Sequence, residues 1–147
     1  MHRPRSPCHA WVYVQDDTDV FVARRCSREF ASRQGLSHAE AEALATAVTE
    51  VARNIVVHAG LGEMHFGALE SDPRRGVIVT ARDAGAGIPH VEQAMQDGFS
   101  TKGGLGFGLP GARRLVDQFE IQSRVGEGTT VRLWKWALGE ARRPDAS

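Results

Sequence analysis

The chain has 147 residues, of which 41% are hydrophobic and 24% are charged, as is ordinary for one soluble globular domain. The 18 Lys and Arg residues balance the 18 Asp and Glu residues, and a formal net charge of zero excludes nucleic-acid binding by bulk electrostatic attraction. No apolar run reaches transmembrane length and no leader precedes a cleavage site, so we expect a cytoplasmic protein with no membrane partner. Cys8 and Cys26 form no C-x-x-C pair, and we expect both to be reduced.

The amino-terminal part of the chain is predicted to contain one strand and one helix. Residues 1–10 include two prolines and are expected to form a flexible extension. Residues 11–15 have strand composition. A helix is then expected from a cap at Asp17 or Thr18 to about residue 34.

A second helix has clearer limits in the sequence. Ser37 and Glu40 have the spacing of a capping box, and Gly60 is a suitable stop. The apolar residues between them recur at helical spacing: Leu44, Val48, Val51 and Ile55.

The second half of the chain is predicted to consist mostly of strand pairs. In chain order we expect strands at 63–70 and 76–82, a short helix at 88–96, a helix at 109–119, and strands at 119–125 and 129–136. Residues 11–138 would form one domain, followed by a flexible tail at 139–147. Helices followed by strand pairs favour an α+β fold, a two-layer α/β sandwich in which helices cover a largely antiparallel sheet.

Three polar residues share one face of the second predicted helix. Glu50, Asn54 and His58 are spaced by four residues, next to the apolar stripe. Asn is a neutral oxygen ligand for Mg²⁺, and Glu one turn earlier can accept a proton from a hydroxyl nucleophile. The alternative is a solvated polar edge of an amphipathic helix, with His58 as an ordinary surface residue.

A second motif follows a β-branched strand and reads Asp83-Ala84-Gly85-Ala86-Gly87-Ile88. An acidic residue at the end of a strand can accept a hydrogen bond from an exocyclic amine such as that of adenine. Two nearby glycines would let the backbone approach a flat base. The alternative is a turn in which Asp83 binds backbone amides.

The third motif is a glycine-rich segment at 103–111 that leads directly into a predicted helix. Glycine-loop amides and a helix N-terminus form a phosphate site, to which Lys102 would add a positive charge. A flexible loop is the alternative. A dinucleotide-binding loop would need a strand immediately before it, which is absent here. A fourth segment, at 126–129, has the composition of a hairpin turn, from which Thr129 could point to the same pocket as Asp83.

The order of these motifs resembles the GHKL (Bergerat-fold) ATPase superfamily, and most closely the small stand-alone switch kinases of the RsbT type. The resemblance rests on residues 50–55, 83–89 and 97–111 and extends over about residues 11–136. It implies helices on a mixed, mostly antiparallel sheet, with ATP held beneath a mobile lid.

The resemblance also implies roles for individual residues. Glu50 would be the general base, Asn54 would hold Mg²⁺, and Asp83 would bind the adenine amine. The remaining nucleotide-binding residues would be Gly85, Gly87, Ile88, Phe99, Ser100, Thr101, Lys102, Gly103, Gly104, Leu105, Gly106, Phe107, Gly108, Leu109 and Thr129.

The switch kinases phosphorylate a serine of an antagonist protein with a STAS fold and thereby change binding partners, in a stressosome or another partner-switching circuit. The further partner would be a phosphatase, another downstream effector or a sigma factor. Two other functions stay open. One is a non-catalytic anti-sigma-factor-like module that binds ATP as a structural ligand. The other, a sensor histidine-kinase catalytic domain, lacks a recognisable phosphoacceptor helix pair here.

Overall fold

A computed structural model describes residues 10–71, 74–87, 95 and 108–138. Within these ranges the elements are β1 (Trp11–Val14), α1 (Asp17–Arg33), α2 (His38–His58), β2 (Gly62–Ser71), β3 (Arg74–Asp83), α4 (Gly108–Leu115), β4 (Gln118–Arg124) and β5 (Gly128–Trp136). The short helix expected at 88–96, the loop before α4 and both expected flexible ends lie almost entirely outside the described residues.

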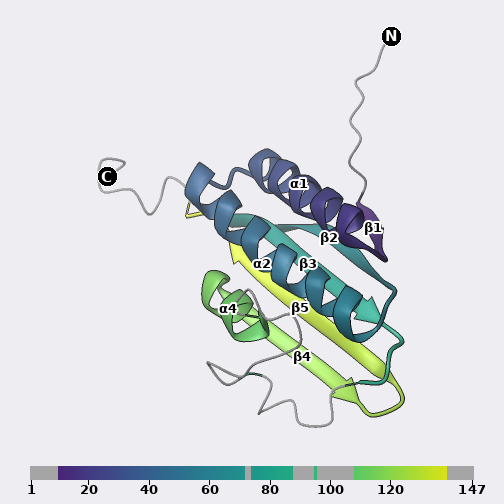
Figure 1. The fold of residues 1–147 in the computed structure, drawn as a ribbon. Coiled ribbons are helices and arrows are strands. Elements are labelled where there is room, and N and C mark those ends of the chain that lie inside the picture. Colours follow the sequence, from purple (N-terminus) through teal and green to yellow (C-terminus); the bar gives the residue numbers. More distant parts are fainter. Residues whose placement is uncertain (1–9, 72–73, 88–94, 96–107, 139–147) are drawn as a thin grey trace, which may run out of the picture.

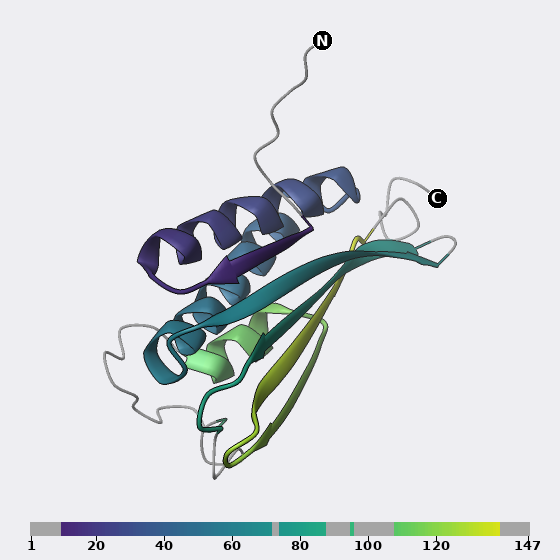
Figure 2. The ribbon, with the colours of Figure 1, turned by 90° about the vertical axis from the view of Figure 1, so that its right-hand side faces the viewer.

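The five strands form one sheet in the order β1-β2-β3-β5-β4. All four pairings are antiparallel, which is more uniform than the mixed sheet expected from the resemblance. The helices lie against one face of this sheet, and α2 runs across its middle between α1 and α4 (Figures 1 and 2). The structure therefore confirms the α+β fold with two layers.

The structure corrects two predicted helix limits. The cap of α1 is Asp16 rather than Asp17 or Thr18, and its Oδ1 accepts a hydrogen bond from the Asp19 backbone N at 3.0 Å. Helix α4 ends at Leu115, so the prediction of helix as far as Phe119 is wrong. Phe119 belongs to β4, where it alternates with exposed neighbours and packs against the core.

The predicted capping box at the start of α2 is confirmed, and it also secures a distant part of the chain. Glu40 Oε1 accepts from the Ser37 backbone N at 2.7 Å, and Ser37 Oγ accepts from the Glu40 backbone N at 3.1 Å. The second carboxylate oxygen, Oε2, accepts from the Leu138 backbone N at 2.9 Å. One buried carboxylate thus links the first turn of α2 to the end of β5.

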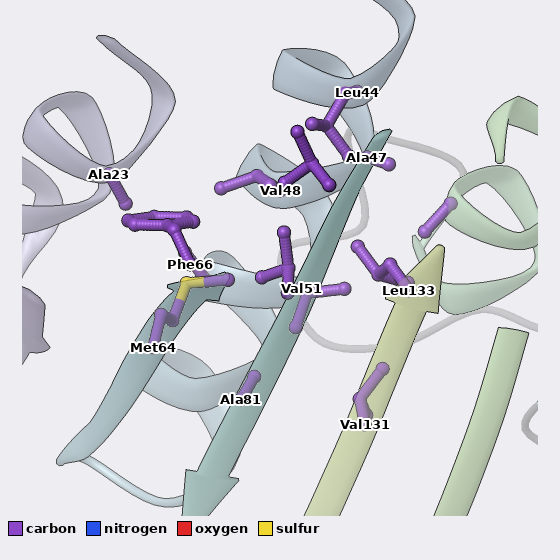
Figure 3. Packing of buried hydrophobic residues seen from close by; sticks show 14 of the residues in the cluster. Ala23, Leu44, Ala47, Val48, Val51, Met64, Phe66, Ala81, Val131 and Leu133 are labelled. Atoms are coloured by element: carbon purple, nitrogen blue, oxygen red, sulfur yellow. The ribbon is translucent and has the colours of Figure 1, made fainter. Parts of the chain in front are cut away.

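The core lies between the helices and the inward face of the sheet (Figure 3). The apolar stripe predicted for α2 is fully buried there against alternate residues of the central strands. Figure 3 shows Val51 of α2 between Met64 of β2 and Leu133 of β5, with Val48 beside Leu44 and Ala47 further along the helix. This packing fixes which edge of α2 remains available for a polar site.

Helices α1 and α2 are joined by charge as well as by apolar contacts. The Glu42 carboxylate of α2 forms ion pairs with two arginines of α1: the nitrogen–oxygen distance is 2.6 Å to Arg28 and 3.2 Å to Arg24. The hydrogen bond from Arg28 holds the pKa of this partly exposed carboxyl below its usual range. Nearby in α1, buried Cys26 is disulfide-bonded, which differs from the expectation of reduced thiols. In the described part of the chain no helix is both long and apolar enough to cross a membrane.

Candidate functional site

One end of the sheet carries a row of polar side chains beneath the helices. Asp83, the last residue of β3, lies directly opposite Thr129 of β5, and Thr129 lies opposite Ser123 of β4. All three belong to the alternating set that faces the helix layer, and Thr129 is only 6% exposed. The predicted pair of Asp83 and Thr129 is therefore brought together by sheet register.

The two hydroxyl groups of this row are hydrogen-bonded to each other. The Ser123 and Thr129 oxygens are 2.7 Å apart, and Ser123 Oγ also donates to the Gly128 carbonyl at 3.1 Å. A hydroxyl has one proton to donate, so with Ser123 donating to Gly128 it is Thr129 that donates within the pair. Thr129 Oγ1 then keeps its lone pairs as acceptors on the side of Asp83.

Asp83 also organises the loop that follows it. Its Oδ1 accepts from the Gly85 backbone N at 2.9 Å, which leaves Oδ2 as a further acceptor. A Cβ on Gly85 would lie 2.6 Å from the Ala59 side chain, and one on Gly87 would collide with the Arg124 backbone. Packing of this loop on α2 and on the β4–β5 hairpin therefore already requires both glycines, before any approach to a flat base is considered.

The other end of the candidate site is where α2 meets the start of α4. The Gly108 backbone N, in the first turn of α4, donates to Glu50 Oε1 at 3.2 Å. Glu50 and Asn54 are both half-buried, as expected for polar residues at the edge of the core. A carboxylate at this position is favoured by the unpaired amides and the dipole of the helix N-terminus.

Helix α2 joins these two ends. Near its C-terminus Ile55 packs beside Gly62, the cross-strand partner of Asp83, and Ala59 packs beside Gly85. Ala59 lies nine positions after Glu50, which corresponds to about 13 Å along the helix axis. An elongated ligand lying along this edge of α2 would meet the Asp83 row at one end and Glu50 at the other.

The remaining predicted site residues divide into two groups. Leu109 is only 4% exposed and packs in the core, so only its backbone is suited to contact a ligand. Ile88 and the nine residues from Phe99 to Phe107 lie outside the described residues, so their role stays a prediction.

Sequence reasoning missed Ser123. The alternation of β4, with Phe119 and Ile121 inward, was the available signal, because it places Ser123 on the same face. Its opposition to Thr129 required the strand register.

The described residues contain no group of three or more His, Cys, Asp or Glu side chains that could hold a metal ion. Mg²⁺ usually takes one or two protein ligands together with substrate phosphates and water. Half-buried Asn54, at the edge of α2, is the residue that the sequence predicts as such a ligand, and this role stays a prediction.

Comparison with known proteins identifies the family. Residues 14–135 match the model of the histidine kinase-like ATPase domain, which covers both ends of the site. The chain belongs to this family. It is 39% identical over 125 residues to the serine/threonine-protein kinase RsbT of Bacillus subtilis, covering 85% of this chain and 94% of that protein.

Anti-sigma F factors are also similar to this chain. The one from Caldanaerobacter subterraneus is 31% identical over 132 residues, covering 84% of this chain and 90% of its own. The one from Geobacillus stearothermophilus is 30% identical over 139 residues, covering 89% and 92%. The chain is a protein kinase of the histidine kinase-like ATPase family.

Proposed function

We propose that this kinase transfers the γ-phosphate of Mg-ATP to a serine or threonine of a STAS-domain antagonist protein in the cytoplasm. Phosphorylation would weaken the complex with the antagonist and free the kinase for a second partner. The observation that carries the proposal is the contact between Glu50 Oε1 and the Gly108 backbone N. It joins a half-buried carboxylate to a helix N-terminus, which favours phosphate.

The chemistry follows from these two groups. The acceptor hydroxyl oxygen forms a bond to the γ-phosphorus as the bond to the β–γ bridging oxygen breaks, and ADP leaves. Glu50 takes the hydroxyl proton, because it is a carboxylate at the phosphate end of the site. The helix amides and Mg²⁺, held by Asn54 and the phosphates, would balance the developing charge. The Asp83 row would fix the adenine at the opposite end.

Incubation of the protein with Mg-ATP and the cognate STAS-domain protein tests the proposal. We expect ADP and one phosphorylated serine or threonine on the STAS protein, located by mass spectrometry. A STAS protein whose acceptor residue is replaced by alanine is the control. ATP binding without transfer to any cognate STAS protein would contradict the proposal.

A smaller effect is expected at Ser123, which positions the Thr129 hydroxyl. Ser123→Ala removes the acceptor for the Thr129 proton, so that this proton can turn towards the ligand. We expect ATP binding to weaken roughly two- to tenfold, the usual value of one hydrogen bond. Titration with a fluorescent ATP analogue measures the change, and Ser123→Thr, which keeps a hydroxyl, should restore affinity. Equal affinity in all three proteins would contradict the positioning role.

The similarity to anti-sigma F factors favours one alternative, a module that binds a sigma factor and ATP without transferring phosphate. The two functions predict the same nucleotide affinity. They differ in the effect of Glu50→Gln, which keeps the acceptor for the Gly108 backbone N but removes the base: it would reduce transfer in a kinase and leave the ATP binding of a module nearly unchanged.

A further inference from the structure

One hydrogen bond of the candidate site joins the predicted base to a group that the phosphates of a nucleotide would also use. The Gly108 backbone N donates to Glu50 Oε1 at 3.2 Å, where α4 begins beside α2 (Figure 1). Within the described ranges this is the only hydrogen bond of the Glu50 carboxylate. A carboxylate oxygen therefore lies where the first amide of a helix would otherwise bind another anion.

The Gly108 N–H group is a large share of what α4 can offer to a phosphate. The first four residues of a helix have N–H groups without a partner inside the helix. In α4 these residues are Gly108, Leu109, Pro110 and Gly111, and because proline has no N–H group only three donors remain. Glu50 already accepts from one of the three. A phosphate that needs this helix end in full must therefore take the Gly108 amide from Glu50.

The Gly108 amide is also open to approach. Its φ of +63° lies in the left-handed region, which favours glycine. Among the described atoms, a Cβ at this position would meet only Pro110 Cδ, at 3.7 Å, which is an ordinary contact. The glycine is thus favoured by the backbone conformation at the start of α4 and not by close packing. A ligand could reach its N–H group without displacing a tightly packed side chain.

A carboxylate and a phosphate cannot both use this N–H group well. One N–H group donates one good hydrogen bond, and two anions within hydrogen-bond distance of the same donor repel each other. The distance of 3.2 Å to Glu50 is long, since charge-assisted hydrogen bonds of this kind usually measure about 2.7–2.9 Å. The Glu50 contact is therefore a weak one. A phosphate whose nucleotide is also held at the adenine end would displace it.

We propose that ATP regulates the base of this kinase by competing with Glu50 for the Gly108 amide. Before ATP binds, the carboxylate is held on the start of α4. When a phosphate takes the amide, the carboxylate is released and turns to the solvent edge of α2, where an acceptor hydroxyl would approach. This inference rests on the proposed nucleotide site and adds an order of events, because the base becomes available only after ATP has bound.

Affinity measurements test the competition. Glu50→Ala removes the competing carboxylate, so we expect ATP to bind roughly three- to tenfold more tightly, the usual value of one hydrogen bond. Glu50→Gln keeps an acceptor for the Gly108 N–H and should bind ATP within about twofold of the wild type. Adenosine has no phosphate and should bind equally to all three proteins. Calorimetry with Mg-ATP and NMR titration with adenosine measure these affinities.

The Gly108 amide itself provides a direct measurement. Its exchange with deuterium, followed by NMR, should be slower in the wild type and in Glu50→Gln than in Glu50→Ala, because only the first two proteins have an acceptor. Saturating Mg-ATP should remove this difference, since a phosphate then accepts from the amide in all three proteins. Glu70→Ala, at an exposed residue near the far end of β2, is the matched control and should leave affinity and exchange unchanged.

Thermal melting shows whether each variant is folded. ATP binding by Glu50→Ala that is unchanged or weaker would overturn the proposal. Equal tightening in Glu50→Gln would also do so, because it would show repulsion between charges without competition for the amide. Tighter adenosine binding by Glu50→Ala would have the same consequence. None of these measurements uses a phosphate acceptor, so failure of transfer to a STAS-domain protein would leave this inference standing, and an unchanged Gly108 amide would refute this inference alone.

Discussion

Glu50→Gln is expected to reduce phosphorylation of the acceptor protein by about 10²- to 10⁴-fold while leaving ATP binding nearly unchanged. The glutamine keeps an Oε1 that can accept the hydrogen bond from the Gly108 backbone N, so the contact between α2 and α4 survives. What is lost is the ability to take the proton of the attacking hydroxyl. Single-turnover transfer of radioactive phosphate measures the rate, and titration with a fluorescent nucleotide measures the affinity.

Glu50→Ala separates the two roles of this residue. It removes both the base and the acceptor at the start of α4, so we expect transfer to fall as far as in Glu50→Gln and nucleotide affinity to change as well. Glu70→Gln, at an exposed residue near the far end of β2, is the matched control because surface ion pairs contribute little. Transfer by Glu50→Gln at the wild-type rate would refute the role as base, whereas ATP binding without transfer by the wild type would favour the non-catalytic module.

Asp83→Asn is expected to weaken ATP binding by roughly 10- to 100-fold. The asparagine oxygen can still accept from the Gly85 backbone N at the position of Oδ1, so the loop should keep its shape. Its amide nitrogen would replace Oδ2, however, and present a donor to the adenine amine, which is itself a donor. The loss of a hydrogen bond to a charged acceptor and the new mismatch together give this magnitude.

Inosine triphosphate provides the complementary measurement, because a carbonyl replaces the amine of adenine. The wild type should prefer ATP strongly, whereas Asp83→Asn should lose most of this preference. Calorimetric titration of both proteins with both nucleotides completes the cycle, and thermal melting checks folding. Equal binding of the two nucleotides by the wild type would show that Asp83 does not contact the base.

Local patterns in the sequence predicted most of the fold. The limits of α2 followed from a capping box, an apolar stripe and a final glycine, all of which act within a few residues. The strands on either side of the turn predicted at 71–75 were likewise evident from their composition, although β2 continues to Ser71 and β3 already begins at Arg74. Where two local signals competed, the prediction failed. Leucine and arginine favour helix through residue 119, but inward packing of Phe119 on the core determines that this segment is strand.

Features that depend on strand register could not be predicted from the sequence. The motif order predicted that Asp83 and Thr129 share a pocket, yet only the antiparallel pairing adds Ser123 to the row. Similarly, Trp134-Lys135-Trp136 alternates as a strand should, but which face the tryptophans occupy depends on where the helices pack. The helices cover the face of the sheet that carries Lys135, so Trp134 and Trp136 lie on the opposite face.

The two hydrogen bonds of the Glu40 carboxylate, one at the start of α2 and one to Leu138, determine where the carboxyl end of the chain can be shortened or extended. The carboxylate that caps α2 also receives an amide 98 positions later in the chain. Truncation before Leu138 would therefore expose a polar group at the start of the helix that carries Glu50 and Asn54. Affinity tags and fusion partners should therefore be attached after Leu138, so that the hydrogen bond between Leu138 and Glu40 is kept.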